Sequence, residues 1–166
     1  ALTARKIYAL SHDELAQLIR PAGYFNLKAK RLRNFVDTLV EQHGASIKRL
    51  FEGETSIVRD RLLAINGVGP ETADSMLLYA GNHNSFVIDA YTKRIFSRHK
   101  WCGENADYDD LKNLCSESLN QKPGTAKLDY WRDYHAQLVG VGNRYCKTRN
   151  PLCNECPLKP LLPTES

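Results

Sequence analysis

The sequence contains no long apolar run and no strong excess of charge of either sign. Its apolar stretches stay well short of the roughly 18 residues that a membrane-spanning helix needs. Its N-terminus also lacks the charged start and hydrophobic stretch of a secretion signal. Lys and Arg number 23 against 19 Asp and Glu, a net charge of +4, which is compatible with a polyanionic partner without requiring one. These absences predict a soluble intracellular protein with no membrane contact.

Strand patterns, internal repeats and low-complexity linkers are also absent from the sequence. Apolar residues recur at helical spacing through most of the 166 residues, a length that suffices to bury a core. We therefore expect an all-α fold with two helical lobes. Residues 1–124 would form a barrel-like helical domain, and residues 125–166 would form a long helix with a cysteine-rich tail. Because the first residue is Ala1, the numbering is expected to begin inside a longer protein.

Start and stop signals divide the chain into segments of helical length. Ser11 and Glu14 have the spacing of a capping box, and Asn26 is suited to cap the next helix, which Gly44 ends. Further helices are expected over 55–65, from Pro70, over 89–98, from 107 or 108 to a stop at Pro123 and Gly124, and within 125–145. Basic residues gather after Asn26, and they indicate either a solvated helix face or a binding surface: Lys28, Lys30, Arg31 and Arg33.

The glycine pair Gly67 and Gly69 joins two predicted helices through a short turn. At least one of these positions is expected to need a positive φ, which glycine adopts without steric cost. A backbone without side chains lets a phosphate approach closely, and the N–H groups at the start of the next helix point toward it. Val68 would pack inward and hold the turn closed. Taken alone, the motif is also typical of a plain helix–helix turn.

A lone carboxylate, Asp89, follows the apolar run of residues 86–88 at the expected start of a helix. By itself such an aspartate is typical of a helix N-cap. Lys93 lies one helical turn further along, on the same face of that helix.

Four stretches together resemble the DNA glycosylases related to endonuclease III. The segment "LAINGVGPETADSMLLY" (63–79) resembles the helix-hairpin-helix of that family, and "FVIDAYTKRI" (86–95) resembles the apolar run that ends in its catalytic aspartate. Upstream, "RPAGYFNLKAKRL" (20–32) resembles the entry into a family helix. Downstream, "YHAQLVGVGNRYCKTRNPLCNECPL" (134–158) resembles the helix that leads to the iron–sulfur loop. The resemblance covers nearly the whole chain.

This resemblance implies a monomeric base-excision-repair enzyme, located in the cytoplasm at the bacterial nucleoid or otherwise inside the cell. It would hold double-stranded DNA by the hairpin and flip a damaged nucleotide into a cleft, because a stacked base cannot be reached. A monovalent cation bound at the hairpin would assist the phosphate contact. The residues expected to contact DNA are Gly67, Val68, Gly69, Thr72, Asn26, Lys28 and Lys93. Family members usually carry further residues upstream that line the cleft and plug the duplex, so base selectivity is largely unreadable here.

The resemblance assigns the chemistry to Asp89, whose charge would stabilise the cationic sugar or orient the attacking water. The bifunctional members carry a lysine two residues past the second glycine, where this chain has Glu71. A carboxylate cannot form an imine, so we predict a monofunctional glycosylase. The closest subgroup resemblance is to the bacterial 3-methyladenine DNA glycosylases, whose alkylated substrates are good leaving groups.

The roles of Glu71 and Lys93, and a protein class other than an enzyme, stay open at this point. Glu71 is interpreted either as a first-turn acid favoured by the helix dipole or as a residue that contacts the base. Lys93 would supply the amine of a bifunctional glycosylase with lyase activity, or would contact a phosphate. A catalytically silent DNA-binding protein would keep the hairpin and lose the chemistry. His135 and its aromatic neighbours are interpreted as core residues of a long helix.

The five cysteines are odd in number and three of them lie close together near the C-terminus, which favours metal ligation over a disulfide framework. Cys146, Cys153 and Cys156 match the first three ligands of the family's four-cysteine [4Fe–4S] cluster, and Leu162 stands where the fourth belongs. Three thiolates would hold a cluster with an exogenous fourth ligand, or a zinc ion, or nothing. Cys102 and Cys115 are expected to be ordinary thiols.

Overall fold

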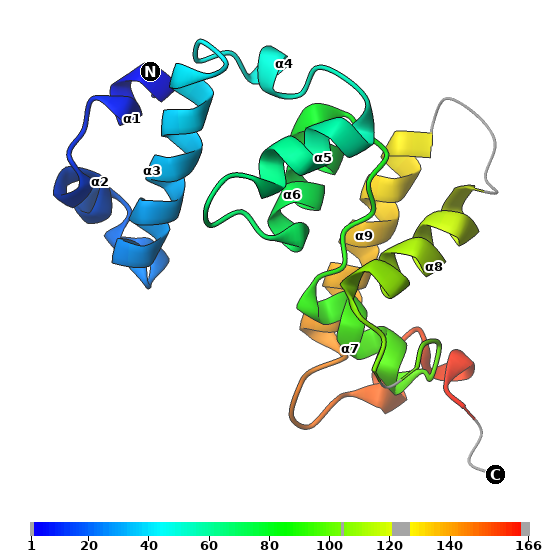
Figure 1. The fold of residues 1–166 in the computed structure, drawn as a ribbon. Helices are drawn as coiled ribbons and strands as arrows, with labels where there is room; N and C mark the ends of the chain where they lie inside the picture. Colours follow the sequence, from blue (N-terminus) through cyan, green and yellow to red (C-terminus); the bar gives the residue numbers. More distant parts are fainter. Residues whose placement is uncertain (1, 104, 121–126, 164–166) are drawn as a thin grey trace. The chain divides into compact units, whose positions relative to one another are not determined.

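The computed structural model describes residues 2–103, 105–120 and 127–163. Over these residues the chain forms α-helices joined by short 3₁₀ and π turns, with no strand, as the helical spacing predicts (Figure 1). Its backbone divides into two compact units, Ala1–Ala73 and Asp74–Ser166, named here unit 1 and unit 2. The division into domains at residues 124 and 125 is a different one and stays a prediction.

Unit 1 is built on one long helix, α3, against which two short helices pack. The helices of this unit are α1 (Ala4–Tyr8), α2 (His12–Leu18), α3 (Phe25–Glu41), α4 (Ile47–Leu50), α5 (Thr55–Leu63) and the start of α6 (Pro70–Met76), with a 3₁₀ turn at Arg20–Ala22. Both α1 and α2 contact α3, as Figure 1 shows in blue and cyan. Leu15, Ala16 and Ala29 form the buried centre of this contact.

The capping signals of unit 1 were predicted correctly for α2 and wrongly for α3. Ser11 and Glu14 form a complete capping box at the start of α2. Asn26 does not cap α3, because the helix begins at Phe25 with Tyr24 as its N-cap residue. Gly23 and Tyr24 both adopt positive φ, so the chain reverses one step earlier than the asparagine signal suggested. Asn26 therefore lies in the first turn of the helix, exposed to solvent.

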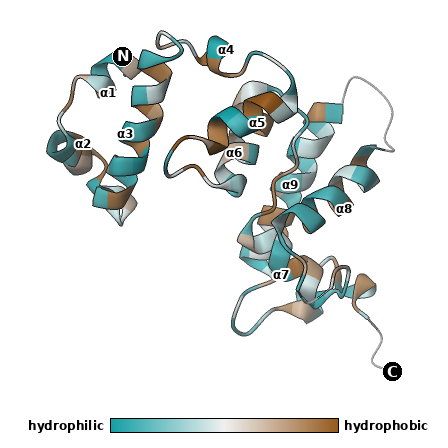
Figure 2. Ribbon diagram, viewed as in Figure 1, coloured by the Kyte–Doolittle hydropathy of each residue, from teal (hydrophilic) through white to brown (hydrophobic). Residues whose placement is uncertain are grey.

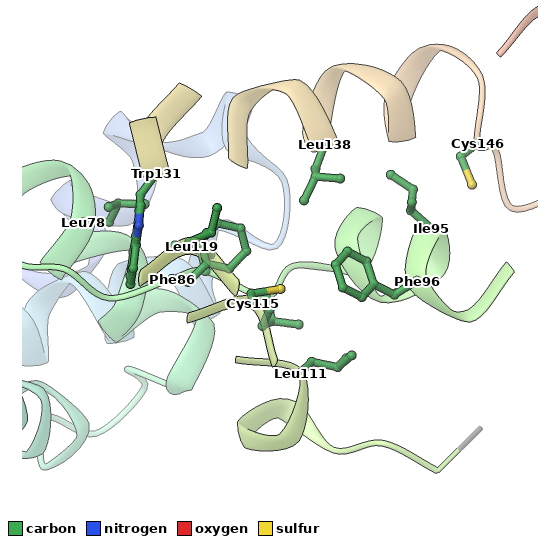
Figure 3. Close-up of a cluster of buried hydrophobic side chains, with 12 residues drawn as sticks. Leu78, Phe86, Ile95, Phe96, Leu111, Cys115, Leu119, Trp131, Leu138 and Cys146 are labelled. Carbon is green, nitrogen blue, oxygen red and sulfur yellow. The ribbon is translucent and has the colours of Figure 1, made fainter. Parts of the chain in front are cut away.

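Unit 2 contains the end of α6 and three longer helices around an apolar core. They are α7 (Ala90–Arg98), α8 (Tyr108–Asn120) and α9 (Lys127–Arg144), with a π turn at Leu77–Gly81 and 3₁₀ turns at Cys153–Glu155 and Lys159–Leu161. The predicted stop signals at Pro123 and Gly124 lie outside the described residues. Figure 3 shows the core, where side chains from α7, α8 and α9 turn toward one another around Phe86 and Trp131.

Close contact between α7 and α9 depends on a glycine. A Cβ placed on Gly142 would lie 2.5 Å from the Tyr91 side chain, so any larger residue would push the two helices apart. Arg94 bridges the same helices by donating to the carbonyls of Cys146 and Gly142.

Figure 2 shows hydrophobic and hydrophilic residues interleaved along most helices, the pattern of amphipathic helices that each bury one face. Within the described part of the chain, none of the helices has the length and apolar character to cross a membrane.

Candidate functional site

The turn of the glycine pair has the backbone geometry that the sequence predicts. Gly67 adopts a φ of 97°, a conformation that side chains rarely tolerate. A Cβ at this position would also lie 2.5 Å from Cγ of Arg31 on α3, so the turn is packed directly on that side chain. Val68 is buried, as expected for a residue that holds the turn closed. Gly67 is therefore required for two reasons, its conformation and the contact with α3.

The backbone donors of this turn are divided between internal and external use. The N–H of Val68 donates to the carbonyl of Ile65 at 3.0 Å, and so it is already satisfied within the turn. The carbonyl of Gly69 accepts from the N–H of Ala73 at 2.9 Å, which opens α6. The N–H groups of Gly67 and Gly69 donate no hydrogen bond to another backbone group among the described residues. The two glycines therefore present donors toward solvent, while Val68 contributes packing.

Helix α3 supports the turn from one side and carries polar side chains next to it. The Asn34 amide donates to the carbonyl of Asn66 at 2.8 Å, which ties α3 to the residue before Gly67. Arg31 is exposed, so its stem lies on Gly67 while its charge reaches water. Lys28 donates to the carbonyl of Ala22 and so closes the loop before α3. Sequence reasoning placed Arg31 in a basic cluster but gave no sign that it packs on the glycine turn.

Asp89 has the position of a helix cap in unit 2. It is the N-cap residue of α7, and its Oδ1 accepts from the N–H of Thr92 at 2.7 Å. Its side chain is only 13 % exposed, and Oδ2 lies 3.7 Å from Nε2 of His135 on α9. His135 is buried, and its Nδ1 lies 2.6 Å from the hydroxyl of Tyr79. The cap predicted for Asp89 is thus confirmed, and a histidine and a tyrosine accompany it.

The neighbours of Asp89 were not found by sequence reasoning. Tyr79 and His135 are 56 positions apart in the chain, and no spacing rule brings them together. The only sequence signal was the chemical type of His135, a titratable side chain on an otherwise apolar helix face. Burial lowers the pKa of His135, and the nearby charge of Asp89 opposes that effect. Burial also raises the pKa of Tyr79.

A second carboxylate, Asp74, anchors the apolar segment that leads to Asp89. It is fully buried and accepts hydrogen bonds from Ser85 at 2.6 Å and Tyr108 at 2.8 Å. The ammonium of Lys112 lies 2.6 Å from its Oδ1. The Tyr108 hydroxyl accepts in turn from the N–H of Ile88 at 3.4 Å. Asp74 therefore fixes both ends of the segment 85–88 and, through it, the start of α7.

The remaining predicted site residues lie on exposed helix surfaces. Glu71 and Thr72 are exposed in the first turn of α6, where Glu71 follows Pro70. Lys93 is exposed on α7, and its ammonium lies 5.7 Å above the ring of Tyr108. Glu71 and Thr72 belong to unit 1, whereas Lys93 shares unit 2 with Asp89. The structure places each on a surface that solvent reaches.

The three C-terminal cysteines and Leu162 line one pocket. Cys146, Cys153 and Cys156 surround it together with side chains that include Arg98, His99 and Lys159. The guanidinium of Arg98 donates to the Cys146 sulfur at 2.8 Å, and this positive charge suits thiolate ligands. Within the described ranges, however, no three His, Cys, Asp or Glu side chains are arranged to hold a single metal ion. Cys146, Cys153 and Cys156 therefore share one pocket without the geometry of a mononuclear metal site.

The two cysteines outside this loop have the surroundings of ordinary thiols. All five cysteines of the chain are free. Cys115 is buried in the core of unit 2, and burial raises its pKa to about 12. Cys102 is partly buried and packs against the same core.

The described residues thus combine helices, a glycine turn and a carboxylate that caps a helix. The profile of the HhH-GPD superfamily of base excision DNA repair proteins matches residues 1–121. The chain belongs to this superfamily. Its fold resembles that of endonuclease III in a non-covalent DNA complex, with a TM-score of 0.76 at 23% identity over 98% of this chain and 69% of the other.

Two relatives share a clearer sequence likeness. A protein of Methanocaldococcus jannaschii whose name assigns it to the DNA repair glycosylases is 44% identical over 155 residues, or 93% of this chain and 68% of that protein. Endonuclease III of Sulfolobus acidocaldarius is 28% identical over 158 residues, or 95% of this chain and 66% of that protein. The chain thus spans about two thirds of the length of each of these two relatives.

One solved structure is similar in both fold and sequence to a moderate degree. It is the 3-methyladenine DNA glycosylase of H. pylori bound to 1,N6-ethenoadenine. The TM-score is 0.69 at 27% identity, and the match covers 85% of this chain and 67% of the other.

Proposed function

We propose that this chain is a monofunctional DNA glycosylase that hydrolyses the N-glycosidic bond of a flipped, damaged base. Membership of the HhH-GPD superfamily supports the reaction class. The observation that carries the proposal is Asp89, a carboxylate that caps α7 through one oxygen and whose other oxygen lies 3.7 Å from Nε2 of His135. A carboxylate held in this way stabilises a cationic sugar as the base departs.

Contacts to the DNA backbone would come from the hairpin and from α3. The N–H groups of Gly67 and Gly69 are donors suited to a phosphate, and a monovalent cation at the turn would add charge to them. Asn26 and Lys28 on α3, Thr72 on α6 and Lys93 on α7 would add contacts to the same duplex. Such contacts position DNA without reading its sequence. They weaken as the salt concentration rises, because the release of counterions from DNA then contributes less free energy to binding. A monomer whose affinity for duplex DNA does not change with salt would contradict this part of the proposal.

The central experiment measures base release from methylated duplex DNA by the wild type and by Asp89→Asn. Asparagine caps a helix about as well as aspartate, so this variant removes the charge and retains the cap. We expect the loss of one preorganised charge to slow release by at least about 100-fold. Thermal unfolding of both proteins provides the control for stability. Equal release by both proteins would contradict the role of Asp89, and no release by either would favour a silent DNA-binding protein.

The absence of lyase activity follows from Glu71, which has no amine. The wild type is expected to leave strands intact until alkali cleaves the abasic site, and to form no adduct when borohydride is added. Glu71→Lys should introduce a trapped adduct, because lysine forms the imine that borohydride reduces. Glu71→Gln is the matched control and should form none. A wild-type adduct that disappears in Lys93→Arg would instead identify Lys93 as the amine of a bifunctional enzyme.

An alkylated base is the substrate class that this chemistry suits best. Alkylation weakens the glycosidic bond, so the carboxylate needs no covalent nucleophile to assist departure. The likeness to the 3-methyladenine DNA glycosylase of H. pylori supports this choice. Release of 3-methyladenine should therefore exceed release of oxidised pyrimidines from matched duplexes. The opposite order would place the substrate among the oxidised bases.

The cysteine loop would hold three corners of a [4Fe–4S] cluster through Cys146, Cys153 and Cys156. Such a cluster would organise the loop beside Arg98, and a fourth ligand from outside the chain would complete it. Leu162→Cys places a thiol at the missing corner. We expect this variant to contain more iron and sulfide per chain than the wild type after anaerobic purification, with stronger visible absorption. Leu161→Cys, one residue earlier, is the matched control, and the absence of iron from all three proteins would contradict a cluster site.

A further inference from the structure

His135 lies beside the candidate catalytic carboxylate and has no part in the function proposed above. Its Nε2 is 3.7 Å from Oδ2 of Asp89, which is longer than a hydrogen bond. The same Nε2 atom is fully buried and has no hydrogen-bond partner among the residues that the structure describes. A buried polar nitrogen without a partner is unusual, because it loses its contact with water and gains nothing in exchange. The polar atom that it faces is the oxygen of Asp89 that the helix cap does not use.

The orientation of the His135 ring is set from its other side. The Tyr79 hydroxyl lies 2.6 Å from Nδ1, and Phe86 packs edge-on at 6.1 Å with an interplanar angle of 87°. Turning the ring over would replace Nδ1 by a carbon atom and would lose the bond to Tyr79. The ring therefore presents Nε2 to Asp89 in a single orientation.

The protonation of His135 follows from its surroundings. Three charged or titratable groups face it or its partner: Asp89 from α7, Tyr79 from the π turn, and Arg132 one turn earlier on α9. Burial lowers the pKa of His135, so the ring is neutral near pH 7 and carries one N–H. A carboxylate only accepts, so the favoured tautomer has its proton on Nε2 and accepts from Tyr79 at Nδ1.

We propose that His135, oriented by Tyr79, is a positioning residue that directs the carboxylate of Asp89 during base release. This inference rests on the proposed glycosylase function. The N–H of Thr92 holds one carboxylate oxygen, and the N–H of His135 attracts the other. A neutral donor fixes the direction of the carboxylate and leaves its negative charge for the cationic sugar. Hydrogen bonds around catalytic groups are often long without substrate and shorten in the complex.

The first test compares four variants by single-turnover base release and by DNA affinity. His135→Ala should slow base release by at least about tenfold, the lower end of the loss seen when residues that orient metal ligands are removed. His135→Gln keeps an N–H near the position of Nε2 and should recover part of that loss. Tyr79→Phe should cause an intermediate loss, because the ring stays but its orientation is no longer held. Tyr134→Phe is the matched control. The Tyr134 ring also packs against Phe86, but it is the Tyr79 hydroxyl that contacts the His135 ring nitrogen.

The outcomes separate this inference from the function on which it rests. DNA affinity should stay within about twofold of the wild type in every variant, because the loss is confined to the transition state. Normal release by His135→Ala with a wild type that depends on Asp89 would overturn the inference alone. So would a parallel fall in release, affinity and thermal stability, which indicates a structural role. No release by the wild type would overturn the proposed function and this inference with it.

Two further measurements respond only to the positioning role. Long-range ¹H–¹⁵N NMR of the wild type should show His135 neutral and protonated at Nε2, and protonation at Nδ1 would overturn the proposal. Base release by the wild type should also fall as pH drops toward the lowered pKa of His135, because an imidazolium beside Asp89 would neutralise the charge that the sugar needs. His135→Gln should lack that step, and an identical acid limb in both proteins would overturn the proposal.

Discussion

Asp74 and Asp89 are two carboxylates of unit 2 whose burial and hydrogen-bond partners differ. Asp74 is fully buried and is satisfied by Ser85, Tyr108 and Lys112. Asp89 is slightly exposed, and one of its oxygens lies 3.7 Å from Nε2 of His135, beyond hydrogen-bond distance. A fully satisfied carboxylate has no capacity left to interact with a substrate, whereas an incompletely satisfied one does. The contacts of Asp74 therefore suit a structural role, and those of Asp89 are compatible with the proposed role in base release.

Exchanging each carboxylate for its amide should separate these two roles most strongly. Asp74→Asn should lower the free energy of unfolding by about 3 kcal/mol, because Lys112 would lose its buried counter-charge. Asp89→Asn should change it by less than about 0.5 kcal/mol, because asparagine retains the cap on Thr92. Urea unfolding of both variants measures these values. Equal destabilisation by the two substitutions would remove the distinction between the carboxylates.

Tyr108→Phe should give a smaller effect that links the two sites. The substitution removes the donor to Asp74 and the acceptor for the N–H of Ile88, next to Asp89. We expect a loss of about 1 to 2 kcal/mol in unfolding free energy, the usual cost of leaving a buried partner unsatisfied. Base release should slow only moderately, since Asp89 itself stays in place. A loss of activity as large as that of Asp89→Asn would show that the Asp74 network takes part in the chemistry.

The pH dependence of the free energy of unfolding should give the smallest of these effects. It should report on His135 and not on the network around Asp74. The pKa of His135 is lowered in the folded protein, so the unfolded chain binds the proton more strongly. Its contribution to stability is therefore complete above about pH 6.5 and declines as pH falls toward the lower folded pKa. The wild type should lose more stability between pH 7 and 5 than His135→Gln. His43, whose pKa burial also lowers, is present in both proteins and cancels in the comparison.

Local signals predicted the elements of the site more reliably than its assembly. The spacing of Ser11 and Glu14 predicted a capping box, and the structure contains one. The glycine pair predicted a positive φ, which Gly67 adopts, and Asp89 was recognised as a cap. Each of these depends on residues within one turn of one another. Asn26 failed as a cap because Gly23 and Tyr24 reversed the chain before it, a backbone effect that outweighs side-chain preference.

Long-range partners could not be read from the chain. His135 was interpreted as a core residue, and it is buried, but its contact with Asp89 arises from the packing of α9 on α7. The network around Asp74 joins residues from α6, the apolar segment and α8, which no periodicity relates. The contact of Arg31 with Gly67 likewise depends on how α3 meets the hairpin.

The helical class, the glycine turn, the capping carboxylate and the glutamate at position 71 can all be predicted from the amino-acid sequence. These features follow from backbone sterics, helix capping and the chemistry of single side chains, all of which act over a few residues. Three relations become visible only in the folded protein: Thr92 binds one oxygen of Asp89, Tyr79 contacts His135, and three cysteines share a pocket with Leu162. Those relations depend on the packing of helices far apart in the chain, because the burial of their apolar faces sets where each polar group lies.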